Sequence, residues 1–152
     1  MKKYVFLLLA PFMLAADLPS AEAALADSGL TLSCASCVLM EKETGAFLLE
    51  ENSPEKLEPA SVTKIMTLLL VMEAVDSGQL SLEDLVTVSA YAAGMGGSQV
   101  YLKEGEQMPV SEMIKCVTVV SGNDCAVALA EHLAGSEGAF VARMNQRAQE
   151  LG

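Results

Sequence analysis

The segment from Cys125 to Ala134 is small or apolar at nearly every position. As a helix it would be apolar on all sides, and such a helix is stable only where other elements cover it. The spacing of apolar residues predicts three more helices, from about Ser61 to Val75, from Pro109 or Val110 to Val120, and from Ala139 to about Leu151. The chain therefore has to bury a cluster of helices.

Side chains three or four positions apart lie on one face of a helix. The first predicted helix is expected to bury Ile65, Leu68, Leu69 and Met72. The helix that ends at Val120 is expected to carry on one side Met113, Ile114, Val117 and Val120. These faces are the predicted contacts within the cluster.

Strand signals are few and short. Two strands are predicted at 35–41 and 46–50, joined by a turn at 43–45, and a third at 85–88. The glycines of segment 94–98 indicate a loop. Because three short strands cannot form a sheet wide enough to cover the helices, the sequence looks unfinished at its C-terminus.

The first 26 residues have the pattern of an export signal. Lys2 and Lys3 precede an apolar run over 4–16, and small residues near position 26 suit a cleavage site. The run is shorter than the about 20 residues that a membrane-spanning helix needs. A retained N-terminal anchor is the alternative, but Asp17 ends the run early. We expect a signal peptide at 1–26 and an exported mature chain from residue 27.

The acidic excess bears on possible partners. The chain has 20 Asp and Glu residues against 9 Lys and Arg residues, a formal net charge of −11. Proteins bind nucleic acid through clustered Lys and Arg. No nucleic-acid partner is therefore expected.

The four cysteines allow two interpretations. Cys34, Cys37, Cys116 and Cys125 could pair in an exported protein, and the first two have a CxxC spacing. No second CxxC or histidine cluster completes a zinc site, so no metal is expected. The favoured interpretation is that they are small buried residues on a strand and two helices.

A serine and a lysine begin the first predicted helix. Ser61 and Lys64 are three residues apart and so share a face. Burial disfavours the charged form of lysine, so a desolvated Lys64 can act as a general base toward the Ser61 hydroxyl. The helix N-terminus adds a positive field and backbone N–H donors for an oxyanion. The alternative is a capping serine beside a solvated lysine.

A second polar group lies 60 residues after Ser61. Ser121, Gly122 and Asn123 stand at the predicted junction of two helices. A serine and an asparagine at such a turn can relay a proton and hold a peptide group. The alternative for this triplet alone is again a helix cap.

Several segments together resemble the low-molecular-mass penicillin-binding proteins, the serine D-alanyl-D-alanine carboxypeptidases of peptidase family S11. Residues 58–67 are similar to the first motif of this family, 97–102 to the loop between motifs, and 121–131 to the second motif and its helix. Pairs of residues within 140–152 continue the resemblance, which covers about 37–152.

The resemblance implies a fold and a reaction. The fold is α+β and β-lactamase/transpeptidase-like, a helical cluster against an antiparallel sheet, with 27–152 forming the N-terminal part of the catalytic domain. The reaction removes the terminal D-alanine from peptidoglycan pentapeptide stems through an acyl-enzyme on Ser61, with Lys64 as base. Ser121 would relay a proton and Asn123 would bind substrate.

The resemblance also implies partners and location. The substrate is the peptidoglycan stem peptide, and β-lactams are covalent inhibitors. No cofactor or metal is implied. The protein is expected outside the cytoplasm in the cell envelope, with peripheral membrane association through a C-terminal anchor that these residues do not contain.

One departure from the family pattern is large. The third motif, Lys-Thr-Gly, does not follow Ser61 anywhere in the 152 residues. Residues 42–45, Lys-Glu-Thr-Gly, precede the serine and are expected to be a hairpin turn. The resemblance implies that the third motif lies on a strand at the edge of the site and that the strand supplies the other oxyanion donor. Without it, the chain by itself is expected to be weakly active or inactive.

Three hypotheses are alternatives to a carboxypeptidase function. A class A β-lactamase shares Ser-x-x-Lys but usually has Ser-Asp-Asn where this chain has Ser-Gly-Asn. A Ser-His-Asp hydrolase is disfavoured because His132 is the only histidine and no Gly-x-Ser-x-Gly occurs. The third reading is a non-catalytic module that binds wall peptide.

Overall fold

The computed structural model describes residues 32–152, so the predicted signal peptide lies outside the described residues. These residues form two compact units that separate between Leu57 and Glu58, and each is described by itself. Within 32–152 we find no helix long and apolar enough to cross a membrane.

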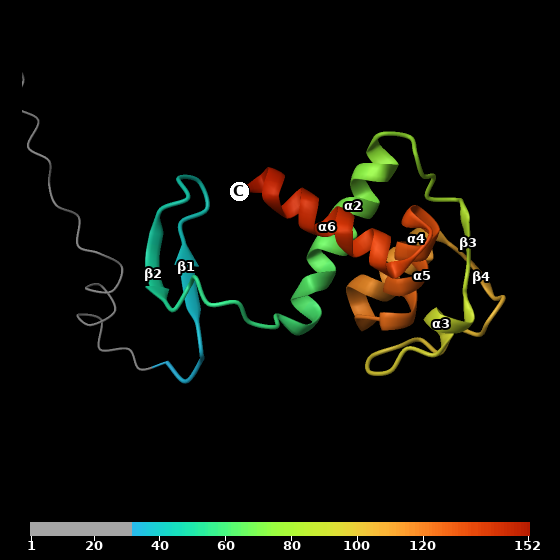
Figure 1. Ribbon diagram of the computed structural model, residues 1–152. Coiled ribbons are helices and arrows are strands. Elements are labelled where there is room, and N and C mark those ends of the chain that lie inside the picture. Colours follow the sequence, from blue (N-terminus) through green and yellow to red (C-terminus); the bar gives the residue numbers. More distant parts are fainter. Residues whose placement is uncertain (1–31) are drawn as a thin grey trace, which may run out of the picture. The chain divides into compact units, whose positions relative to one another are not determined.

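The N-terminal unit is a β-hairpin (Figure 1). Strand β1 (Cys37–Met40) pairs antiparallel with β2 (Phe47–Glu51), close to the predicted bounds. The turn is organised by the Glu41 carboxylate, which accepts hydrogen bonds from the backbone N–H groups of Thr44 at 2.7 Å and Glu43 at 3.0 Å. The Lys-Glu-Thr-Gly segment is thus a hairpin turn, as expected.

The C-terminal unit contains helices and a second small sheet. A 3₁₀ turn at Ala60–Thr63 leads into α2 (Lys64–Asp76). Strand β3 (Leu85–Thr87) pairs antiparallel with β4 (Gln107–Pro109), and α3 (Ala90–Ala93) lies between them in sequence. The remaining elements are α4 (Val110–Lys115), a π-helical turn at Cys116–Val120, α5 (Asn123–Ala134) and α6 (Glu137–Leu151).

Helix α5 lies at the centre of this unit (Figure 1). It contacts α2, α3, α4, α6 and β3. The buried apolar residues of α5 are Cys125, Val127, Ala128, Leu129 and Ala130. The prediction that this helix is deeply buried is confirmed, and it explains why the other helices surround it.

The predicted buried face of α2 is wrong in part. Ile65 is 68% exposed and Met72 is 40% exposed, whereas Leu68 and Leu69 are half-buried. The residues that α2 buries are Thr67, Val71 and Ala74. Because α2 is apolar on nearly all sides, periodicity does not select a face, and small side chains at spacings of four and three allow close helix packing.

The segment that ends at Val120 follows the prediction for its first two turns only. Met113 and Val117 are buried, and Ile114 is half-buried. Val120 is 46% exposed, because the α-helix changes to a π-helical turn after Lys115 and the faces no longer stay in register.

The prediction that the cysteines are buried is correct for only some of the four. All four are free thiols, and Cys125 is buried, Cys37 and Cys116 are half-buried, and Cys34 is exposed. Burial raises the pKa of the Cys125 thiol above its ordinary value. The expectation of burial is wrong for Cys34, which precedes β1 instead of lying within it.

Candidate active site

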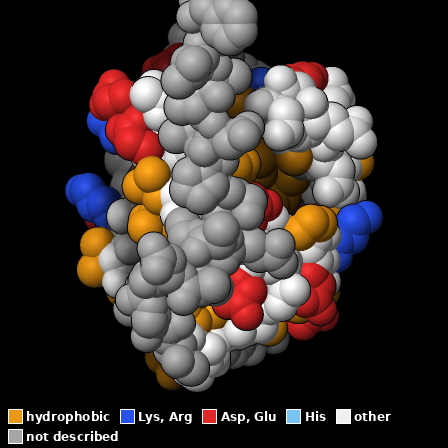
Figure 2. Space-filling view, turned by 90° about the vertical axis from the view of Figure 1, so that its left-hand side faces the viewer, with side chains coloured by type: hydrophobic (Ala, Val, Ile, Leu, Met, Phe, Trp, Pro, Cys, Tyr) orange, Lys and Arg blue, Asp and Glu red, His pale blue; other side chains and the backbone are white. Residues whose placement is uncertain are grey.

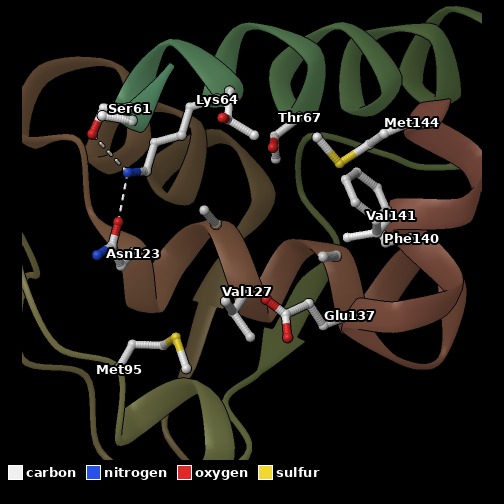
Figure 3. A pocket seen from close by; sticks show the side chains of 14 residues that line it. Ser61, Lys64, Thr67, Met95, Asn123, Val127, Glu137, Phe140, Val141 and Met144 are labelled. Carbon is white, nitrogen blue, oxygen red and sulfur yellow. Dashed lines mark hydrogen bonds between the residues drawn. The ribbon is translucent and has the colours of Figure 1, made fainter. Parts of the chain in front are cut away.

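The turn that leads into α2 places Ser61 beside Lys64. Pro59 precedes the 3₁₀ turn, and Lys64 is the first residue of the α-helix. The Lys64 side-chain nitrogen Nζ lies 3.3 Å from the Ser61 hydroxyl oxygen Oγ (Figure 3). The two side chains are therefore within hydrogen-bond reach, as the three-residue spacing predicts.

Asn123 extends this contact to a second helix. It is the first residue of α5, and its amide oxygen Oδ1 accepts a hydrogen bond from Lys64 Nζ at 2.5 Å (Figure 3). Residues 59 positions apart in sequence thus meet at one point. The fold joins Ser61, Lys64 and Asn123 in a single chain of contacts.

The orientation of the Asn123 amide is set by the loop at 94–98. Its nitrogen Nδ2 donates to the Gly96 carbonyl at 2.6 Å, and the Asn123 backbone N–H donates to the Ser98 carbonyl at 2.7 Å. Gly97 has a φ of 78°, and a Cβ there would lie 2.8 Å from Nδ2. The loop approaches the asparagine so closely that only glycine fits at position 97.

Ser121 occupies a different position. It ends the π-helical turn with a left-handed φ of 60° and is half-buried. It does not line the cavity described below, and in residues 32–152 its hydroxyl makes no hydrogen bond to Ser61 or Lys64. Of the four predicted site residues, Ser61, Lys64 and Asn123 are joined by contacts, and Ser121 is not part of this chain of contacts in the described residues.

A cavity of about 450 Å³ opens beside this contact chain. Ser61, Lys64 and Asn123 line it together with apolar residues of α5 and α6 (Figure 3). The apolar α6 residues are Phe140, Val141 and Met144, and the acidic Glu137 of α6 also lines the cavity. The sequence interpretation missed this wall, although the apolar spacing of the last helix was its visible signal.

Figure 2 draws the charged side chains on one face of the described residues, outside the atoms in grey. In Figure 2 the Lys and Arg side chains stand apart from one another, whereas acidic side chains are spread among apolar ones. Across the described residues 32–152 we find no group of three or more His, Cys, Asp or Glu side chains placed to hold a metal ion.

Comparison with known proteins connects this geometry to a family. Residues 21–152 match the family described as D-alanyl-D-alanine carboxypeptidase, peptidase S11. The D-alanyl-D-alanine carboxypeptidase DacF of Bacillus subtilis is 48% identical in an alignment 155 residues long, which covers 100% of this chain and 40% of the relative.

Solved structures have the same fold. DacD from Francisella tularensis aligns with a TM-score of 0.76 at 38% identity, over 81% of this chain and 30% of that chain. Penicillin-binding protein D2 from Listeria monocytogenes, in its ampicillin-bound form, aligns with a TM-score of 0.71 at 29% identity, over 81% of this chain and 49% of that one. The predicted β-lactamase/transpeptidase-like fold is confirmed for this portion.

The chain covers less than half of the length of these two relatives. The chain spans about 40% of the length of DacF and 30% of DacD. Within that span the match runs through both the Ser61 and the Asn123 segments. This chain belongs to the peptidase S11 family of D-alanyl-D-alanine carboxypeptidases.

Proposed function

We propose that this chain carries the nucleophile half of a serine D-alanyl-D-alanine carboxypeptidase that trims peptidoglycan pentapeptide stems. The observation that supports this proposal is the contact chain from Ser61 Oγ through Lys64 Nζ to Asn123 Oδ1, with separations of 3.3 Å and 2.5 Å. It occurs in a chain that belongs to the carboxypeptidase family.

In the proposed reaction Ser61 attacks the carbonyl carbon of the penultimate D-alanine. The neutral Lys64 amine takes the hydroxyl proton as the new C–O bond forms. The C–N bond then breaks, and the departing D-alanine amine leaves with a proton. Water hydrolyses the acyl-enzyme ester, releases the shortened stem and restores the serine hydroxyl.

The surroundings of Ser61 suit this chemistry. The N-terminus of α2 directs its positive end toward the developing negative charge, and the Ser61 backbone N–H is proposed as one oxyanion donor. Lys64 is half-buried, and its Nζ lies within hydrogen-bond reach of both Ser61 and Asn123. Asn123 is proposed to hold Lys64 in position and to bind the peptide amide of the substrate.

Ser121 is proposed as the proton relay to the departing amine. The support for this role is its place two residues before Asn123, on the turn between the π-helical segment and α5. Its hydroxyl lies outside the cavity lining, so the relay requires its side chain to reach the substrate from the edge of the site.

The proposal extends to inhibitors, location and rate. A β-lactam would acylate Ser61, in line with the ampicillin-bound form of the Listeria monocytogenes relative. We propose that the protein works outside the cytoplasm on the cell wall. Because Lys-Thr-Gly does not follow Ser61 in the 152 residues, turnover by this chain alone should be low, since one lost oxyanion donor lowers kcat by about 10²–10³.

Covalent labelling with a fluorescent penicillin tests the proposal. The product of the whole reading frame should form one adduct, located at Ser61 by mass spectrometry of its peptides. Ser61→Ala should abolish the adduct, because it removes the attacking oxygen. Ser77→Ala, at the other end of α2, is the matched control and should label like the wild type.

Two outcomes would contradict the proposal. Normal labelling of Ser61→Ala would show that another residue is the nucleophile. A folded wild-type protein that forms no adduct, but binds soluble stem peptide reversibly, would instead establish the non-catalytic module.

A further inference from the structure

Asp124 is a fully buried carboxylate next to the candidate site. Its exposure is 0%, and it is one of two buried polar residues in the described part of the chain, with Thr67. A buried carboxylate is costly unless hydrogen-bond donors surround it. The proposed reaction makes no direct use of this group, so its role has to be sought in what it holds.

The Asp124 carboxylate is surrounded by backbone N–H donors. Oδ2 accepts from Val100 N–H at 3.0 Å and from Leu102 N–H at 3.2 Å. Oδ1 accepts from Cys125 N–H at 2.9 Å, and more weakly from Val100 at 3.3 Å. Both oxygens therefore accept from Val100, while Leu102 donates to Oδ2 and the start of α5 donates to Oδ1.

The segment 96–102 carries both the backbone N–H groups that bind Asp124 and the carbonyls that orient Asn123. Val100 and Leu102 flank Tyr101, which has a left-handed φ of 63°. A non-glycine residue in that conformation is strained and persists only where neighbouring contacts fix it. A few residues earlier in the same loop, the carbonyls of Gly96 and Ser98 accept from Asn123.

A continuous path thus runs from Asp124 to the proposed nucleophile. The carboxylate fixes the loop, and the Gly96 carbonyl fixes the Asn123 amide with its nitrogen toward the loop. The amide oxygen is thereby left facing Lys64 Nζ, which contacts Ser61. An amide turned the other way would present N–H donors to the lysine and lose this hydrogen bond.

We propose that Asp124 is a positioning residue for the acylation of Ser61. It acts through the loop at 96–102 and the Asn123 side chain, and it does not touch the substrate. This inference rests on the proposed function for its effect on rate, but its effect on the Asn123 amide can be measured independently of any activity.

Asp124→Asn is the first test. The amide has a single oxygen acceptor, so in either orientation its NH₂ group faces a backbone N–H, either that of Leu102 or that of Cys125. We expect the acylation rate constant at saturating penicillin to fall about 10- to 100-fold. The fraction of protein finally labelled should stay unchanged, whereas irreversible unfolding of part of the sample would lower that fraction and leave the rate constant of the folded protein unaltered.

Asp84→Asn is the control for removing a carboxylate. Asp84 accepts a backbone hydrogen bond from Ser81 N–H at 2.8 Å, in an exposed turn outside the cavity. Its acylation rate constant should match that of the wild type.

Gly97→Ala tests the same path from its other side, and remains informative if Asp124→Asn does not fold. The new Cβ would lie 2.8 Å from Asn123 Nδ2 and would displace the amide. Gly105→Ala is its matched control, because Gly105 has nearly the same φ, 79° against 78°, and no atom within 4 Å of the new Cβ. The first substitution should slow acylation and the second should not.

The NMR signal of the Asn123 side-chain amide measures the orientation of this group without any acylation. It is recorded on the product of the whole reading frame, labelled with ¹⁵N-asparagine. It should shift in Asp124→Asn and Gly97→Ala and stay in place in Gly105→Ala. An unshifted signal in both test variants overturns the inference, and so does a shifted signal with an unchanged acylation rate constant. If the wild type forms no adduct, the proposed function fails, while a shifted signal still supports control of Asn123 by Asp124.

Discussion

Ala60 stands immediately before Ser61 with a φ of 49°, a left-handed conformation that residues other than glycine rarely adopt. Such strain costs on the order of 1–3 kcal/mol and concentrates at functional sites. Its position suggests that the entry of the chain into the 3₁₀ turn is constrained by the need to present the Ser61 hydroxyl. Nothing in the identity of an alanine signals this conformation, so sequence reasoning could not have found it.

Glu41 provides a pH-dependent prediction at the same scale. Its hydrogen bond with the Thr44 hydroxyl, and then those with the backbone of Glu43 and Thr44, lower the pKa of its carboxyl from the ordinary value of 4.5. A lowered pKa means that the ionised form is favoured by the folded turn. The stabilisation is therefore complete above pH 4.5 and is lost as pH falls through the lowered value.

The chemical shift of the Thr44 backbone amide checks this prediction. It should titrate with a midpoint below 4.5, and Glu41→Gln should abolish the titration. Glu55→Gln, a nearby change outside the turn, should leave the curve as it is. A midpoint at or above 4.5 would contradict the proposed hydrogen bonds.

At the scale of helices and strands, apolar periodicity correctly predicted the β1–β2 hairpin and the deeply buried helix α5. The π-helical turn at Cys116–Val120 was not predicted, because an apolar run with β-branched residues looks alike in an α- and a π-helix. Strand β4 was missed because Gln107–Pro109 has no strand pattern of its own and forms by pairing with β3. The contacts of Asn123 with the loop are likewise tertiary and leave no local signal.

The corrected packing face of α2 can be tested by a matched pair of substitutions. Val71→Ala removes two methyl groups from a fully buried site and should lower the free energy of unfolding by about 2 kcal/mol. Ile65→Ala, on the same helix but 68% exposed, should change it by less than about 0.5 kcal/mol. Urea denaturation of both variants measures the difference. Equal losses would mean that the originally predicted face is also buried.

At the scale of the whole molecule, the two units differ in how much they bury. In the hairpin, Leu49 is the only buried residue of β1 and β2. The exposed apolar residues of these strands are Val38, Leu39, Met40, Phe47 and Leu48. In the other unit, α5 is enclosed by four helices and a strand. A two-stranded hairpin alone is marginally stable in water, whereas a surrounded helix opens only with global unfolding.

Hydrogen exchange of the 152-residue chain should therefore separate the units. Backbone amides of β1 and β2 should exchange much faster than those of Val127 to Ala130 in α5, because local opening of the hairpin exposes almost no buried surface. Mass spectrometry of peptic fragments resolves the two regions. Equal protection of hairpin and α5 would show that the exposed apolar strand residues are covered in solution, and the two units would then have to unfold as one.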